Sequence, residues 1–183
     1  MTKQKGFTLM ELLIVIGVLG ILAAGLLAAI DPFEQLKKAR DATNRDAAIT
    51  LMSGFQRFYA THANLPWGVA GLGVTPCVFG GTVGTAFPGP RASGVVELKS
   101  VLTCITPLIN DGELKESFTD AVNFKMYLSS EDNSSIMVCF APEGKATRND
   151  SETKWLYTPG SNKIEKLTVA CTDTTGNCLQ CFE

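Results

Sequence analysis

The sequence predicts an α+β fold, in which one long N-terminal helix packs on an antiparallel sheet of three or four strands. Three observations predict this fold. Residues 7–30 form an apolar run that suits a membrane, and residues 31–63 continue the helical pattern but become amphipathic. Residues 121–170 contain short segments with alternating apolar and polar positions, separated by turn residues. The helix is therefore expected to be transmembrane in its first half and amphipathic in its second half.

Length and composition narrow the class of protein. The chain has 183 residues, enough for one compact domain with its own core. Only 19% of the residues are charged, and the formal net charge is −2. A nucleic-acid-binding protein usually carries a clustered basic surface, so nucleic acid is not indicated as a partner.

The apolar run of residues 7–30 is long enough to cross a membrane as a helix. It contains a single charged residue, Glu11. At about 1.5 Å per residue the helix would be roughly 36 Å long, against a hydrocarbon core of about 30 Å. Lys3 and Lys5 precede the run and predict a cytoplasmic N-terminus. A cleaved secretory signal fits poorly, because its apolar region is usually about 7–15 residues long.

Glu11 is the residue that a simple membrane anchor does not explain. Burying an acidic side chain in a bilayer costs about 2.5–3.5 kcal/mol on insertion scales, so such a residue usually has a partner. If the chain is cut after Gly6, the new amine of Phe7 becomes a cation one helical turn away. The same amine of a neighbouring chain could also reach Glu11. The alternative is a side chain that snorkels to the membrane surface.

These residues resemble the class III signal of type IV pilins and type II secretion pseudopilins. In that family a basic leader ends in Gly and is followed by Phe, Thr, Leu, a further apolar residue, Glu and a long apolar helix. The corresponding string here is Lys5-Gly6-Phe7-Thr8-Leu9-Met10-Glu11. The resemblance implies removal of the leader, residues 1–6, by a prepilin peptidase that cuts between Gly6 and Phe7, and N-methylation of Phe7. It also implies that Glu11 meets the N-terminus of an adjacent subunit during assembly.

The same resemblance implies where the chain resides and what it contacts. The precursor would lie in the bacterial inner membrane with a cytoplasmic N-terminus, and the mature chain would enter an extracellular filament or a periplasmic pseudopilus. Its partners would be further copies of the chain, the prepilin peptidase, the inner-membrane assembly platform, minor pilins and the membrane itself. Such a subunit is structural and not an enzyme.

Small residues form a track along the apolar helix. Gly20, Ala24 and Ala28 lie four residues apart, and Gly17 lies one turn earlier on nearly the same face. Such a strip lets helices approach closely, although Gly and Ala are also common in membrane helices generally. Many members of the family have a proline within this helix, where this chain has Ala28.

The helix is predicted to kink or restart at Asp31. This residue is a candidate N-cap, followed by Pro32 at the first helical position and Glu34 in the first turn. The charged residues that follow are expected to form a solvated stretch. Apolar residues then share one face, at Ala48, Leu51, Met52, Phe55, Phe58 and Tyr59. His62 is expected at the end of the helix and not as a ligand.

Residues 64–183 are predicted to form a globular head. Residues 64–94 are dense in Gly and Pro and predict a long loop. Residues 95–120 predict a short helix, interrupted by Pro107, and a turn. Candidate strands of the sheet are 122–128, 135–141, 154–157 and 164–169. The tail, residues 171–183, is rich in Thr, Gly and Cys and should need disulfides to stay ordered.

Six cysteines lie in the head, at Cys77, Cys104, Cys139, Cys171, Cys178 and Cys181. An even number confined to one region is typical of disulfides formed outside the cytoplasm. We expect Cys139 to pair with a tail cysteine and Cys77 with Cys104, although several connectivities remain open. A competing interpretation is a metal site at Cys178-x-x-Cys181 with Cys171 nearby, but no second such pair supports it. For this Cys-x-x-Cys pair a structural bridge is favoured over a redox-active one.

No active site is evident in the sequence. His62 is the only histidine, so a Ser-His-Asp arrangement has no support, and the glycines lack the setting of a phosphate-binding loop. Asp173 and Asn177 are too few oxygen ligands to predict a calcium site. We therefore predict no catalytic residue, no metal and no cofactor, with calcium as the alternative.

The favoured function is that of a structural subunit of a type IV pilus-like filament. An anchor alone does not explain why Gly6-Phe7 and Glu11 occur together. The alternatives are a type II secretion pseudopilin, a minor pilin whose head serves adhesion or DNA uptake, and an anchored periplasmic domain that never polymerises. The cysteine-rich tail and the long loop favour a pilus, because an exposed fibre benefits from a stapled head.

Overall fold

The computed structural model divides the chain into two compact units, residues 1–36 and residues 37–183. Each unit is described by itself. The residues that the structure describes are 6–29, 31–67, 95–121, 125–130, 135–161, 163–172 and 175–183.

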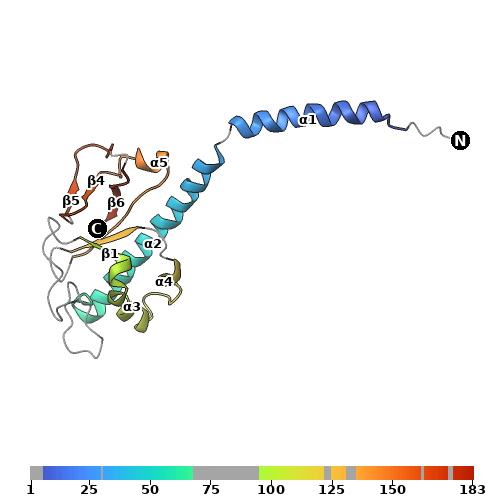
Figure 1. Cartoon of the computed structure of the whole chain (residues 1–183). Helices are drawn as coiled ribbons and strands as arrows, with labels where there is room; N and C mark the ends of the chain where they lie inside the picture. Colours follow the sequence, from blue (N-terminus) through green and yellow to red (C-terminus); the bar gives the residue numbers. More distant parts are fainter. Residues whose placement is uncertain are drawn as a thin grey trace. The chain divides into compact units, whose positions relative to one another are not determined.

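Two helices follow one another at the N-terminal end of the chain (Figure 1). Helix α1 covers Leu9–Ala29, and helix α2 covers Pro32–His62. The Asp31 carboxylate accepts hydrogen bonds from the backbone N–H groups of Phe33 and Glu34, at 3.1 and 3.3 Å. This arrangement confirms Asp31 as an N-cap, because it satisfies N–H groups that a first helical turn leaves unbonded. The prediction that the helix restarts at Asp31 is therefore confirmed.

The second half of α2 forms one side of the hydrophobic core of the head. Its buried apolar side chains recur every three or four residues, as at Leu51, Phe55 and Phe58. Gly54 is buried on the same helix, and a Cβ there would lie 3.3 Å from Cδ2 of Leu108. The missing side chain therefore lets the segment around Leu108 pack closely against the helix.

The sheet has six strands in the order β1-β2-β3-β6-β4-β5, and every pairing is antiparallel. The strands are β1 (Val96–Glu97), β2 (Met126–Ser129), β3 (Met137–Phe140), β4 (Trp155–Thr158), β5 (Lys163–Lys166) and β6 (Cys178–Phe182). The predicted α+β class is confirmed, but the predicted three or four strands are too few. The two strands that the prediction missed are β1 and β6.

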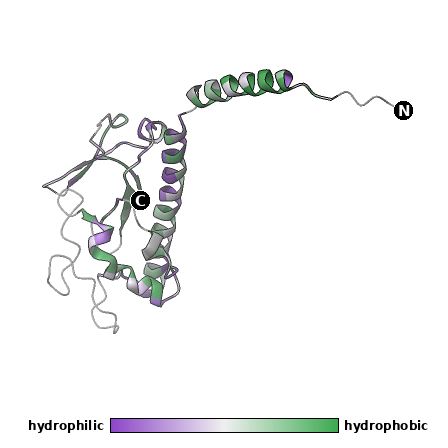
Figure 2. Ribbon diagram, turned by 45° about the vertical axis from the view of Figure 1, so that its right-hand side comes forward, coloured by the Kyte–Doolittle hydropathy of each residue, from purple (hydrophilic) through white to green (hydrophobic). Residues whose placement is uncertain are grey.

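The two faces of the sheet bury different side chains. Leu128 and Val138 are a register pair on the face that packs against α2. Tyr127 and Cys139 are the adjacent pair, and they lie on the opposite face with a second buried cluster. Figure 2 shows α2 running beside the strands, with green apolar residues where they meet. This division follows from the alternation of side chains along a strand.

Residues 95–110 differ from the predicted short helix. They form the two-residue strand β1, a 3₁₀ segment η1 (Leu98–Cys104) and helix α3 (Thr106–Asn110). Pro107 does not interrupt a helix here, because it lies in the first turn of α3, where a missing N–H costs no intrahelical bond. Two further short helices are α4 (Phe118–Ala121) and α5 (Lys145–Arg148).

The tail of the chain is the largest correction to the predicted architecture. Residues 178–182 are a central strand, β6, which pairs with β3 on one side and with β4 on the other. The prediction placed no strand in this tail, which it described only as rich in Thr, Gly and Cys and in need of disulfides. Pairing with two neighbouring strands supplies the hydrogen bonds that make it a strand.

Disulfides hold the tail in place. Cys139 pairs with Cys181 across β3 and β6, which confirms that Cys139 bonds a tail cysteine. Cys171 pairs with Cys178. A bridge within Cys178-x-x-Cys181 is therefore not formed, because residues three apart on a strand point to opposite faces. Cys104 is also disulfide-bonded, whereas its predicted partner Cys77 lies outside the described residues.

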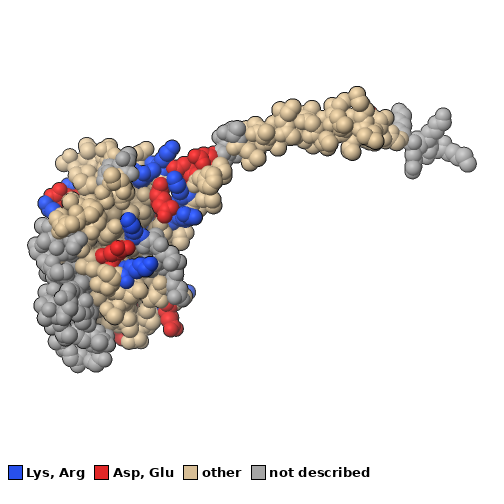
Figure 3. Space-filling model, viewed as in Figure 1, with Lys and Arg blue, Asp and Glu red and all other residues tan. Residues whose placement is uncertain are grey.

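Charged side chains of α2 tie the helix to the rest of the head. Asp41 is only 2% exposed and accepts hydrogen bonds from the backbone N–H groups of Glu143 and Gly144, both at 2.8 Å. Arg45 pairs with Glu152 at 3.0 Å. The prediction of a wholly solvated charged stretch is therefore wrong for Asp41. Figure 3 shows charges of both signs over the head, whereas α1 shows only uncharged atoms on the face drawn.

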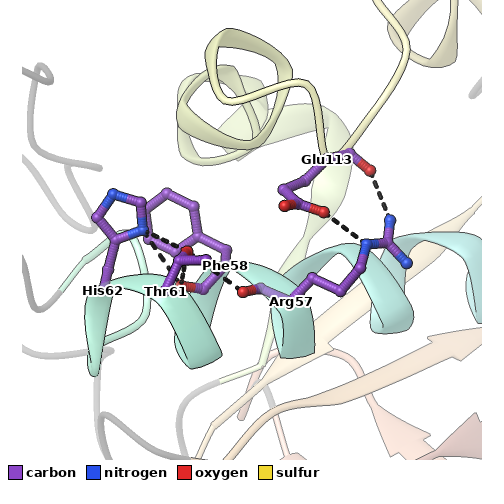
Figure 4. A network of polar contacts seen from close by, with 5 residues as sticks. All are labelled: Arg57, Phe58, Thr61, His62 and Glu113. Carbon is purple, nitrogen blue, oxygen red and sulfur yellow. Dashed lines mark hydrogen bonds and ion pairs between the residues drawn. The ribbon is translucent and has the colours of Figure 1, made fainter.

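A network of polar contacts lies near the C-terminal end of α2 (Figure 4). The Arg57 guanidinium donates to a carboxylate oxygen of Glu113 at 2.5 Å and to its carbonyl at 2.7 Å. His62 is the last residue of the helix, as predicted, and its ring stacks on Phe58 with the centroids 4.2 Å apart. Its Nε2 lies 3.5 Å from a carboxylate oxygen of Asp111. These contacts give His62 a structural role between α2 and the turn after α3.

Candidate functional site

The start of α1 is built by a reciprocal pair of side chains. The backbone N–H and the hydroxyl of Thr8 both donate to Oε2 of Glu11, at 2.9 and 2.8 Å. In return, the Thr8 hydroxyl accepts from the backbone N–H of Glu11, at 3.2 Å. Thr8 is the N-cap and Glu11 is the third helical residue, so the two form a capping box.

This capping box was missed in the sequence, although Thr-x-x-Glu before an apolar run is its usual signal. It changes the interpretation of Glu11. The carboxylate already has a partner within its own chain, and it lies where the helix dipole favours a negative charge. A charge from Phe7 is therefore not needed to give Glu11 a partner in the single chain. Among the described residues, the hydrogen bonds that the Glu11 carboxylate accepts both go to Oε2.

The rest of α1 is an apolar surface that its own chain leaves uncovered. Residues Leu9–Leu27 are long and apolar enough to cross a membrane, by length and composition. Their side chains are all exposed, with Ile21 at 75% as an example. An apolar helix exposed on every side is stable only in lipid or against other helices. The predicted transmembrane helix is confirmed to this extent.

The predicted small-residue strip faces open space in the single chain. A Cβ at Gly17 or Gly20 would meet no atom within 4 Å, and Ala24 is exposed. Ala28 belongs to α1, but its side chain lies outside the described residues. A role of this strip in helix packing therefore stays a prediction.

The predicted processing site precedes the helix. Gly6 and Phe7 have no regular secondary structure, and both are exposed. The chain is therefore accessible at the predicted cleavage site. Cleavage at this bond and methylation of Phe7 stay predictions. No group of His, Cys, Asp or Glu side chains that could hold a metal ion occurs among the described residues.

Comparison with known proteins identifies this N-terminal segment. Residues 1–27 match the family described as the prokaryotic N-terminal methylation motif. No curated protein and no solved structure matches the chain. The chain therefore carries the class III prepilin signal of type IV pilins and pseudopilins, and its head has a pilin-like α+β architecture. This signal implies processing by a prepilin peptidase and membrane-associated filament assembly.

Proposed function

We propose that this chain is the structural subunit of a type IV pilus-like extracellular filament. Cleavage after Gly6 exposes Phe7, which is N-methylated, and subunits then assemble by packing their α1 helices. One observation carries the proposal: α1 is apolar on every side and has a single carboxylate, Glu11, at its N-terminal end. The disulfides of the head suit an exposed fibre, which benefits from covalent staples.

The capping box suggests how Glu11 binds two partners, one with each carboxylate oxygen. Its Oε2 caps α1 through Thr8, while its Oε1 remains for a second donor. Hydrolysis after Gly6 converts the backbone nitrogen of Phe7 into an amine, which is protonated and stays so after methylation. In the filament, Oε1 of one subunit accepts a hydrogen bond from the Phe7 amine of the next subunit.

The energetics favour this pairing as the element that sets the register between subunits. Moving α1 from lipid to a bundle of helices gains little from hydrophobicity, because lipid tails are as apolar as the side chains of α1. An unpaired amine and carboxylate are costly in an apolar core, whereas their mutual contact is strengthened by the low dielectric. Each subunit supplies one of each, so every axial step of the filament satisfies both.

Mass spectrometry of the membrane-extracted protein tests the processing. We expect a mature chain that begins at N-methylated Phe7. An intact leader in cells with an active prepilin peptidase would contradict the proposal. The same measurement on a Gly6→Val variant should show the uncut precursor, which controls for nonspecific trimming.

Substitution of Glu11 tests the assembly. Glu11→Gln should leave membrane insertion and the head fold unchanged but abolish filaments, because a neutral amide can accept a hydrogen bond but cannot neutralise the charge of the Phe7 amine in an apolar core. Asp46→Asn is the matched control, since it removes an exposed carboxylate of α2. Normal filaments from Glu11→Gln, counted by electron microscopy, would show that the carboxylate has no part in assembly.

A further inference from the structure

We propose that the Cys139–Cys181 disulfide is a thiol–disulfide exchange site, open to small anionic thiols that attack Cys181 from a cleft in the sheet. The other described cysteines are shielded from such attack. Three features support this inference. They are the place where β4 stops pairing with β6, which we call the fork of the sheet, the exposure of the cysteines, and the charges that line the cleft.

The fork arises because β4 accompanies β6 over only part of its length. β4 pairs with β6 at Leu179 and Cys178, whereas β3 pairs with β6 farther along, at Gln180, Cys181 and Phe182. The end of β6 therefore has a strand on only one side. A cleft of about 480 Å³ opens there, and Cys181 is part of its wall. This volume suits a ligand of small-molecule size.

Among the described cysteines, Cys181 differs from the others in its exposure to solvent. Cys104, Cys139 and Cys178 are essentially unexposed, and Cys171 is only 4% exposed. Cys181 is half-buried, whereas these four cysteines are buried. Exchange requires a thiolate to reach a sulfur, so access decides which disulfide reacts first. The Cys171–Cys178 bond, buried at both ends, should therefore react slowly.

The charges of the lining favour an anionic attacker. Lys154 and Lys166 line the cleft, and within the described part of the chain neither pairs with a carboxylate. Lys166 instead lies over the Trp155 ring, 5.0 Å from its centroid. The Arg45 charge is balanced by Glu152, while Glu183 is an acidic residue that opposes the lysines. Nearby cations stabilise the thiolate form of an incoming thiol, which is the form that attacks.

The reaction balances with two equivalents of thiol. A thiolate attacks the sulfur of Cys181 and forms a mixed disulfide, while the bond to Cys139 breaks and Cys139 leaves as a thiolate. A second thiolate attacks the mixed disulfide at the sulfur of the first thiol. This step releases Cys181 and an external disulfide, so two thiols are oxidised and one protein disulfide is reduced. The reverse sequence closes the bond from an external disulfide.

Opening this bond loosens the middle of the sheet. Among the described strands, β6 alone pairs with both β3 and β4. It therefore joins the β1-β2-β3 part of the sheet to the β4-β5 hairpin. The Cys139–Cys181 bond crosses one of these two joints.

The full chain in detergent can be tested with three thiols of different charge. The protein is incubated with reduced glutathione, 2-mercaptoethanol or cysteamine, free thiols are trapped with N-ethylmaleimide, and peptide mapping gives a rate for each cysteine per thiolate. We expect Cys139 and Cys181 to be labelled about tenfold faster than Cys104, Cys171 and Cys178. Glutathione, which is anionic, should react about threefold faster than cationic cysteamine at low salt.

A double variant isolates the lysines. Lys154→Gln with Lys166→Gln should remove the preference for glutathione and leave the rate with 2-mercaptoethanol unchanged. Lys163→Gln is the matched control, because Lys163 pairs with Glu165 and does not line the cleft. Faster labelling of Cys171 and Cys178, equal rates with all three thiols, or rates independent of thiol concentration would overturn the proposal. The last result would mean that unfolding, not access through the cleft, limits the reaction.

Discussion

Helix α1 and the second half of α2 are both helical and apolar, yet they satisfy their apolar surface in different ways. Side chains such as Leu51 and Phe55 of α2 are fully buried against the sheet of the same chain. The side chains of residues 9–27 in α1 are all exposed. The head therefore completes its own core, whereas α1 depends on lipid or on other copies of the chain. Substitutions in the two regions should be detected by different measurements.

The largest expected effect on stability comes from the core of the head. Phe55→Ala should lower the free energy of unfolding of the head by about 3–5 kcal/mol, because it removes a fully buried ring and leaves a cavity. Leu13→Ala in α1 removes a comparably apolar side chain that is exposed, and it should leave head unfolding unchanged. Denaturant unfolding followed by tryptophan fluorescence gives both values. Similar losses in the two variants would break the comparison.

A second prediction concerns the buried charge that joins α2 to the segment before α5. Asp41→Ala should cost about 2–3 kcal/mol, because the N–H groups of Glu143 and Gly144 lose their acceptor. Asp46→Ala, at an exposed position of the same helix, should change stability by less than about 0.5 kcal/mol. Hydrogen exchange should quicken at Gly144 in the first variant alone. Unchanged protection there would show that Asp41 is dispensable.

Local patterns explain which parts of this fold could be predicted. α1 and the packing face of α2 follow from periodicity within one segment, and the cap at Asp31 follows from the order Asp-Pro. β6 could not be predicted in the same way, because its strand character comes from pairing with β3 and β4, which are remote in sequence. The burial of Asp41 likewise depends on a contact with residues about a hundred positions away.

The same distinction between local patterns and remote contacts applies to the candidate site. Gly6, Phe7 and Glu11 could be recognised because the signal is a short contiguous string, and the family match covers it. The capping box between Thr8 and Glu11 is also local and was open to prediction. Filament contacts belong to other copies of the chain, so neither a single sequence nor a single structure contains them.

A smaller effect is expected at the start of α1. Thr8→Val keeps the shape of the side chain but removes the hydroxyl that caps the helix, so the first turn should be destabilised by about 1 kcal/mol. Thr8→Ser keeps the hydroxyl and should behave as the parent chain. Amide exchange of residues 9–11 in detergent gives the difference. The head should be unaffected in both variants, which again separates the two regions.

The subtlest prediction concerns pH and the head alone. Burial, assisted by the Glu97 carboxylate and by Tyr157, raises the pKa of Tyr127 to about 12. In the unfolded chain a tyrosine has a pKa of about 10. Below pH 10 the phenol is neutral in both states, so its contribution to stability is fully present. Between pH 10 and 12 the unfolded chain loses the proton first, and the free energy of unfolding falls.

Tyr127→Phe isolates this contribution from the lysines that titrate in the same range. The parent head should lose stability more steeply than the variant when unfolding is measured from pH 9 to pH 12. α1 contributes no buried phenol. Ionisation of tyrosine should therefore not change the helix content of α1 in detergent between pH 9 and pH 12. Equal slopes for the parent chain and the variant would show that the Tyr127 phenol ionises as readily in the folded head as in the unfolded chain. Its burial in the second cluster, away from α2, would then be looser than the structure indicates.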